Sequence, residues 1–231
     1  ADQAKNNAFY EIKMDDVKTY MPYSYSKFPE IAWSQAKVNG KIYMIPTLSW
    51  RYNQNVVAYR GDLLEKYGMQ ELKTIDDLEL YMKKVASSEK GITPFHVNSS
   101  SFLTVLWLEK PNKWQELDNT FCYNYNDPNQ TEIFSYVMTD EFVSFCEKMR
   151  DFNTSGVWTD DMINDTVSQG DKFKNGLIAA TTHNHGTTIG YVYSCDDDHP
   201  EWKARIFDPY QGENVIASSF IGNGWAIHRT T

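Results

Sequence analysis

The chain has 231 residues, long enough for one or two domains and for a hydrophobic core that needs neither a disulfide nor a metal ion. Its 31 acidic and 22 basic residues give a net charge of -9, which argues against nucleic acid or an anionic membrane surface as the partner. No apolar run approaches the roughly 18 residues of a membrane-spanning helix, and Ala1 to Tyr10 carry no signal-peptide pattern. The 15 Tyr, 12 Phe and 7 Trp would suit both a core and a site that stacks on flat ligand faces.

Strand and helix patterns alternate along the chain, which predicts an α/β fold. The turn residues Asn39-Gly40 precede a predicted strand at 41–46. The β-branched and apolar run 56–59 is typical of a buried strand. A short helix is predicted at 62–67, with Gly68 ending it.

Longer helices are predicted further along the chain. Thr74 precedes one of them, and Asp77 stands where a capping box needs its acidic partner. Asp140 is the predicted N-cap of a second helix. The apolar faces expected from helical spacing are Ile75, Leu78, Met82 and Val85 in the first helix, and Phe142, Phe145, Cys146 and Met149 in the second.

The remaining elements are shorter. Strands are predicted at 93–97 and 177–182, and a short helix at 166–174 ends at Asn175-Gly176. The segment 216–227 is predicted to be extended. These elements complete an alternating strand and helix order.

The order of these pieces resembles the extracellular solute-binding proteins of bacterial ABC importers, the group that includes maltose-binding protein. The similarity is greatest to lipoprotein members from Gram-positive bacteria. It rests on an ordered set of segments rather than on one motif: NGKIYMIP at 39–46, VAYRGDLLEKYG at 57–68, TIDDL at 74–78 and FKNGLIAA at 173–180.

The resemblance implies a two-lobed fold of the type II periplasmic-binding-protein kind, with mixed sheets flanked by helices. Residues 1–55 and 216–231 would supply part of the first lobe, and 56–215 the second, with the chain crossing between lobes at 50–55 and 215–219. Because members of this group are usually about twice as long, we expect the chain to be a fragment of a longer protein. The full-length protein is expected to be a monomer outside the cell, held at its surface by a lipid anchor.

His183-Asn184-His185 is the sharpest local feature, because it follows a predicted strand and would place both imidazoles on one face. Two imidazoles at this spacing could ligate a metal ion or could contact a ligand from a loop at the strand end. In the family that the chain resembles, the loop after this strand lines the binding cleft. The prediction is therefore that His183, Asn184 and His185 contact the ligand and that they bind no metal.

Trp50, Arg51 and Tyr52 stand at the first predicted crossing. An aromatic face can stack on a sugar ring, and the guanidinium of arginine offers a rigid set of donors to hydroxyls or carboxylates. The alternative is that Trp50 and Tyr52 pack between the lobes while Arg51 is solvated.

Further candidate ligand contacts follow the predicted strand at 93–97 and lie near the C-terminus. Asn98 and Ser100 could bond ligand hydroxyls, with Phe102 as an apolar platform, and Asn98 or a following serine could cap a helix, either in place of this contact or together with it. Trp225 could stack on the ligand, although a tryptophan at such a position is more often part of the core.

These features favour a binding module that captures a small polar solute, most readily a sugar or oligosaccharide, by closure of two lobes, with an ABC importer permease as its partner. No catalytic residue and no cofactor are assigned. The sequence contains no G-x-x-x-x-G-K-[ST], G-x-S-x-G or H-E-x-x-H motif, and Cys122, Cys146 and Cys195 lack C-x-x-C spacing. Two alternatives remain. One is a secreted carbohydrate hydrolase that uses His183 and His185 as metal ligands or a pair of carboxylates that the sequence does not locate, and the other is a protein-binding surface built from the aromatic residues.

Overall fold

The computed structural model describes residues 2–48, 55–98, 114–116, 121–124, 129, 132–210 and 221–230. It divides the chain into two compact units, which we call unit 1 (Ala1–Tyr52 with Ile216–Thr231) and unit 2 (Asn53–Val215). The lobe boundaries at 1–55, 216–231 and 56–215 stay a prediction. The crossings predicted at 50–55 and 215–219 fall outside the described residues, except for Asn55.

Unit 1 combines short helices with two pairs of antiparallel strands. Its elements are α1 (Asp2–Lys5), α2 (Met14–Tyr20), α3 (Pro22–Lys27), α4 (Glu30–Gln35), β1 (Lys37–Val38), β2 (Lys41–Ile42), β3 (Ile45–Leu48) and β11 (Ile221–Trp225). Asn39 and Gly40 both have positive φ, as a type I′ turn requires, and they join β1 to β2. The predicted strand at 41–46 is therefore two strands, because β2 pairs with β1 whereas β3 pairs with β11.

The core of unit 1 centres on Trp33 of α4. Val17, Ala36 and Ile42 are buried beside it. The rings of Tyr25 and Phe28 pack on the Trp33 ring, with centroids 6.0 and 5.5 Å away. Aromatic packing of this kind lets a few short helices bury a continuous apolar cluster.

Unit 2 is built on a four-stranded sheet in the order β10-β4-β9-β5. Strands β4 and β9 are antiparallel, as are β10 and β4, whereas β5 and β9 are parallel. A smaller antiparallel sheet has the order β6-β7-β8. The elements of unit 2 are β4 (Asn55–Tyr59), α5 (Gly61–Lys66), α6 (Ile75–Ser88), β5 (Thr93–Phe95), β6 (Trp114–Glu116), β7 (Phe121–Asn124), β8 (Ile133–Ser135), the 3-10 helix η2 (Tyr136–Met138), α7 (Asp140–Thr154), η3 (Asp160–Asn164), α8 (Gln169–Lys174), β9 (Ile178–Asn184), α9 (His185–Asp198), η4 (Pro200–Trp202) and β10 (Arg205–Phe207).

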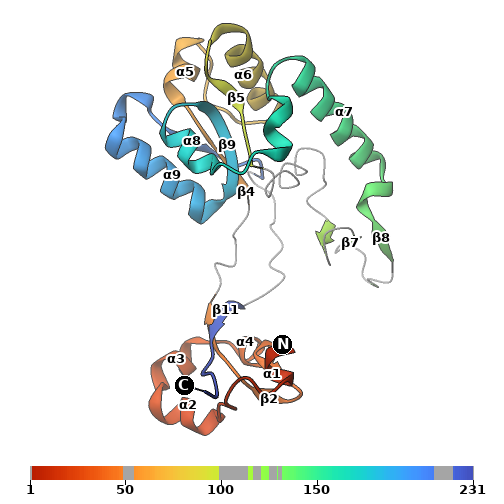
Figure 1. The fold of residues 1–231 in the computed structure, drawn as a ribbon, viewed down its shortest axis with the longest axis vertical. Coiled ribbons are helices and arrows are strands. Elements are labelled where there is room, and N and C mark those ends of the chain that lie inside the picture. Colours follow the sequence, from red (N-terminus) through yellow and green to blue (C-terminus); the bar gives the residue numbers. More distant parts are fainter. Residues whose placement is uncertain are drawn as a thin grey trace. The chain divides into compact units, whose positions relative to one another are not determined.

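Helices cover both faces of the four-stranded sheet, and the alternation along β4 separates the two cores (Figure 1). Val57 and Tyr59 face a large cluster that includes the buried residues of α6. Between them, Ala58 belongs to a second cluster with Phe173 of α8 and Cys195 of α9. The sheet is therefore buried on both faces, which explains why the β4 run is apolar throughout.

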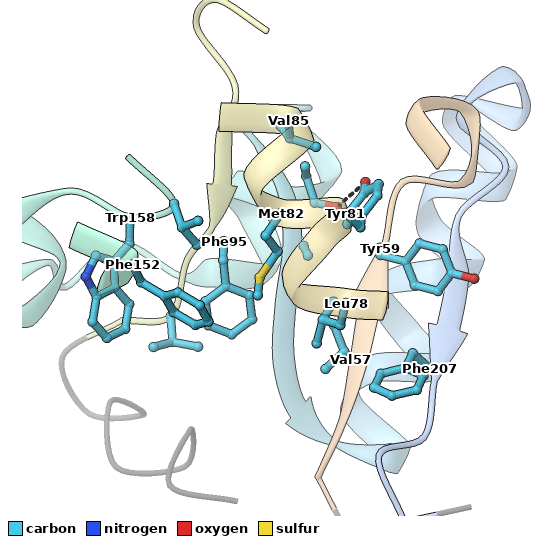
Figure 2. Close-up of a cluster of buried hydrophobic side chains, with 14 of the residues drawn as sticks. Val57, Tyr59, Leu78, Tyr81, Met82, Val85, Phe95, Phe152, Trp158 and Phe207 are labelled. Carbon is cyan, nitrogen blue, oxygen red and sulfur yellow. Dashed lines mark hydrogen bonds between the residues drawn. The ribbon is translucent and has the colours of Figure 1, made fainter. Parts of the chain in front are cut away.

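Helix α6 confirms the capping box predicted at Thr74. The Thr74 side chain accepts a hydrogen bond from the Asp77 N–H, and the Asp77 carboxylate accepts one from the Thr74 N–H. Figure 2 shows Leu78, Tyr81, Met82 and Val85 along this helix in the large core. Tyr81 was not among the predicted core residues, yet it is fully buried, and its hydroxyl donates to the carbonyl of Arg60 over 3.0 Å.

Several other predictions are confirmed or corrected. The strand at 56–59 and the helix ended by Gly68 (φ +64) are confirmed. Thr139, not Asp140, is the N-cap of α7, because its hydroxyl accepts from the Phe142 N–H. Cys146 is exposed on that helix, and the face that packs continues instead to Phe152.

The other short elements shift by a few residues. Helix α8 begins only at Gln169, behind the N-cap Ser168, and the strand predicted at 177–182 runs two residues further. Within the extended segment predicted at 216–227, the described strand is β11. In the part of the chain that the structure describes, no helix combines the length and the apolar character needed to span a bilayer.

Candidate functional site

One edge of the four-stranded sheet gathers polar side chains. Because β5 and β10 run in the same direction as β9, all three strands end at this edge, and β4 begins there. Asn55 pairs with Asn184 in the β4–β9 ladder, and His183 precedes it. Asn98 follows β5 and Asp208 follows β10. We call this set of strand ends the polar edge.

At the polar edge, strand β9 passes directly into helix α9 without a loop. Asn184 is the last strand residue and also the helix N-cap, since its side-chain Oδ1 accepts from the Thr187 N–H over 3.0 Å. His185 is the first helical residue and is exposed. The alternation of a strand therefore does not place His183 and His185 on one face, because the strand ends between them.

His183 has a well-defined hydrogen-bond environment. Its Nδ1 lies 2.8 Å from the backbone nitrogen of Asn184 and 2.8 Å from the side-chain Nδ2 of Asn184. The ring of Tyr191 from α9 meets the imidazole edge-on, with centroids 6.3 Å apart. The imidazole is half-buried, and this burial lowers the pKa of His183, which favours the neutral ring.

Gln169 joins the end of β5 to the end of β9. The Asn98 N–H donates to Gln169 Oε1 over 3.0 Å, and Gln169 Nε2 donates to the carbonyl of Thr182. Gln169 is only 2% exposed, so both of its polar atoms exchange water for protein partners. This bridge holds Asn98 close to the strand residue that precedes His183.

A charged cluster supports the same end of unit 2. His96, which is 2% exposed, places Nε2 3.3 Å from Oδ2 of Asp165. The Asp165 carboxylate also pairs with Lys172 of α8 and accepts from the Val167 N–H over 2.8 Å. The hydrogen bond from Lys172 is the main reason that the pKa of the Asp165 carboxyl lies below its ordinary value.

The candidate residues predicted from the sequence fall into three groups. Asn98, His183, Asn184 and His185 belong to the polar edge of unit 2. Trp225 lies on β11 in unit 1 and is 76% exposed, so it is not a core residue there. The other candidates, Trp50, Arg51, Tyr52, Ser100 and Phe102, lie outside the described residues.

Gln169 and Asp165 were missed by the sequence analysis. Each has one partner far along the chain, because Gln169 accepts from Asn98, 71 residues before it, and Asp165 contacts His96, and nothing local marks a buried glutamine. The described residues hold no group of three or more His, Cys, Asp or Glu side chains placed to share a metal ion.

Comparison with known proteins gives matches among solved structures. No protein-family model matches this chain, and no curated protein matches it. The N-glycan transport solute binding protein NgtS from Streptococcus pneumoniae, in complex with Man1GlcNAc, is 17% identical over 90% of this chain and 45% of its own, with a TM-score of 0.65. This chain has the type II periplasmic-binding-protein fold.

Two further structures have the same fold. The ABC substrate-binding protein Lmo0181 from Listeria monocytogenes, in complex with cycloalternan, is 17% identical, with a TM-score of 0.58, over 99% of this chain and 54% of its own. The maltose-binding protein MalE from the same organism, in complex with maltose, is 18% identical, with a TM-score of 0.52, over 100% of this chain and 54% of its own. The matches confirm the predicted resemblance at the level of the fold, and the chain spans about half the length of these proteins.

Proposed function

We propose that this chain is part of an extracellular solute-binding protein of an ABC importer, and that the whole protein captures a sugar or oligosaccharide. The observation that carries the proposal is the fold that nearly the whole chain shares with binding proteins whose structures hold carbohydrates. In this proposal unit 2 is the second lobe and unit 1 is part of the first. Closure of the lobes about their connecting segments would bury the ligand, and a permease would bind the closed form.

The chemistry of the polar edge supports a neutral, hydroxylated ligand. Amide and imidazole groups can both donate to and accept from sugar hydroxyls, and Asn55, Asn98 and His183 supply such groups. In the described segments 55, 96–98, 182–186 and 207–210, the sequence has no lysine or arginine, and Asp208 is acidic. These described segments therefore offer no lysine or arginine to an anionic sugar.

Aromatic stacking would add to the affinity that these hydrogen bonds supply. The exposed indole of Trp225 in unit 1 offers a face for a sugar ring, as do Trp50 and Tyr52 in the sequence-based proposal. Stacking and directed hydrogen bonds need no covalent step, so the proposed protein is a carrier rather than an enzyme. The further proposals of a monomer, a lipid anchor and an extracellular location rest on the family resemblance.

The alternative of a metal-dependent hydrolase has less support than ligand binding. It was argued from two imidazoles that project to one face after a strand, whereas His185 begins helix α9. We therefore propose that His183 and His185, with Asn98 beside them, contact the ligand and bind no metal, and that Asn184 serves ligand binding through its hydrogen bonds to His183 and to the start of α9.

A thermal-shift screen of the full-length protein to which this chain belongs tests the proposed function. Maltose, N-acetylglucosamine and neutral oligosaccharides would be compared with glucuronate and with short peptides. A neutral carbohydrate at 100 times its Kd should add about 2.7 kcal/mol to stability and raise Tm by several degrees. Stabilisation by peptides alone, or turnover of a carbohydrate that stops when a chelator is added, would contradict the proposal.

A further inference from the structure

The hydrogen bonds around His183 determine which ring nitrogen carries the proton. A backbone N–H can only donate, so the Asn184 N–H, 2.8 Å from Nδ1, requires a lone pair on that nitrogen. A neutral imidazole with an unprotonated Nδ1 carries its hydrogen on Nε2. The remaining ring nitrogen, Nε2, has no hydrogen-bond partner among the described residues.

The side chain of Asn184 strengthens the same state. Its Oδ1 is occupied by the Thr187 N–H at the start of α9, which determines the orientation of the amide. The Nδ2 group therefore faces His183 Nδ1, at 2.8 Å, and it can only donate. Two donors converge on one acceptor, and a proton on Nδ1 would meet both of them.

We infer that Asn184 is a positioning residue that holds His183 as the Nε2–H tautomer, so that residue 183 acts as a hydrogen-bond donor that selects an acceptor oxygen on the ligand. This inference rests on the proposed function for its ligand, although the tautomer itself belongs to the free protein. The acceptor is a hydroxyl, ring or carbonyl oxygen of an uncharged solute. The side chain of Asn184, by contrast, is engaged by the Thr187 N–H and by His183, so Asn184 does not contact the ligand directly.

Other features of the site agree with this assignment. No carboxylate or cation in the described part of the chain contacts the imidazole, and Tyr191 meets it through its ring. The half-burial of His183 lowers its pKa, which acts in the same direction as the two donors. A carboxylate in place of the amide would reverse this balance.

A long-range 1H–15N correlation spectrum of the ligand-free protein tests the tautomer. The His183 signals, assigned by their loss in His183→Gln, should show a protonated Nε2 and an unprotonated Nδ1 at neutral pH. In Asn184→Asp the cap is kept, because Asp and Asn cap equally well. The carboxylate should nevertheless draw a proton onto Nδ1, whereas Asn184→Ser keeps the cap and should leave Nδ1 unprotonated.

Two results would overturn the inference without touching the proposed function. One is a protonated Nδ1 in the unmodified protein, and the other is an unchanged His183 spectrum in Asn184→Asp.

Ligand affinity tests the role of the donor. The probe is the neutral sugar that gives the largest thermal shift in the screen, measured by calorimetry with the full-length protein. His183→Leu should weaken binding about tenfold, as loss of one neutral hydrogen bond predicts, and His183→Gln, whose amide can donate from the same reach, should stay within about threefold. Equal loss in both variants, or no loss in either, would contradict the donor role, whereas absence of binding by the unmodified protein would count against the proposed function.

Discussion

Tyr81 shows how a single hydroxyl ties the large core of unit 2 to its sheet. The side chain comes from α6, and its hydroxyl donates to the carbonyl of Arg60 just beyond the end of β4. Burial raises the pKa of Tyr81 well above its ordinary value, so the phenol stays protonated and remains a donor. The polar end of an aromatic side chain thus finds its partner inside the core, as Figure 2 shows for its surroundings.

Replacement of this hydroxyl gives a prediction at the residue scale. Tyr81→Phe leaves the Arg60 carbonyl without that donor and should lower the free energy of unfolding by about 1 kcal/mol. Urea denaturation followed by circular dichroism measures the change. Tyr193→Phe is the matched control, because Tyr193 is 66% exposed, and its unfolding free energy should be unchanged. Equal effects of the two substitutions would show that the buried hydrogen bond adds no stability.

At the scale of elements, helices α8 and α9 pack closely because Gly170 lacks a side chain. A Cβ built on Gly170 would overlap the Tyr191 ring of α9. Gly190, in the middle of α9, has open space around it. Two glycines in neighbouring helices therefore differ completely in what a methyl group would meet.

Alanine at these two positions should have opposite effects. Gly170→Ala should destabilise by roughly 1–3 kcal/mol, because the core must move to admit the methyl group. Gly190→Ala should stabilise by about 0.5–1 kcal/mol, because alanine loses less backbone freedom in a helix. Thermal and urea unfolding of both variants measures this contrast. A Gly170→Ala protein as stable as the unmodified protein would refute the close packing of α8 on Tyr191.

Elements with strong local signals were predicted from the sequence, and elements that depend on distant contacts were not. Gly68 and the Thr74 capping box specify α5 and α6 within a few residues of chain. Helix α9 has poor intrinsic propensity, since its first turns contain two glycines and two threonines, and it is held by packing against β4. The loop considered at the end of the predicted strand is instead the start of α9.

The same distinction applies to the candidate site. The position of His183 at a strand end follows from the local pattern, whereas the Gln169 bridge and the helix that begins at His185 depend on tertiary contacts. Sequence alone therefore identified Asn98 and His183 as candidates but not the edge that they share or the way their side chains are held.

At the scale of the whole molecule, charge pairing should make stability depend on pH. Asp165 joins segments far apart in the chain, because it contacts His96 after β5 and Lys172 in α8. Its carboxyl has a pKa below the ordinary 3.8 in the folded protein. The stability that this shift supplies is complete well above pH 3.8 and is lost as pH falls from there through the lower folded pKa, because the unfolded chain binds the proton first.

Asp165→Asn tests this linkage. Its deficit in unfolding free energy, measured by urea denaturation, should be largest near pH 7 and should shrink as the pH falls below about 3.8. Lys172→Met removes the main cause of the shift and should abolish the same part of the pH dependence. A deficit that stays constant from pH 7 to pH 3 would mean that Asp165 acts only through packing.

The direct passage from β9 into α9 restricts how this region can diversify. One residue inserted into the strand would move every side chain on one side of the insertion to the opposite face of the sheet. One residue inserted at the junction would rotate the helix by about 100°. It would also separate the imidazole from the amide that caps the helix. Homologous proteins that recognise other solutes are therefore expected to exchange side chains at this junction while conserving its length, with insertions and deletions confined to other parts of the chain.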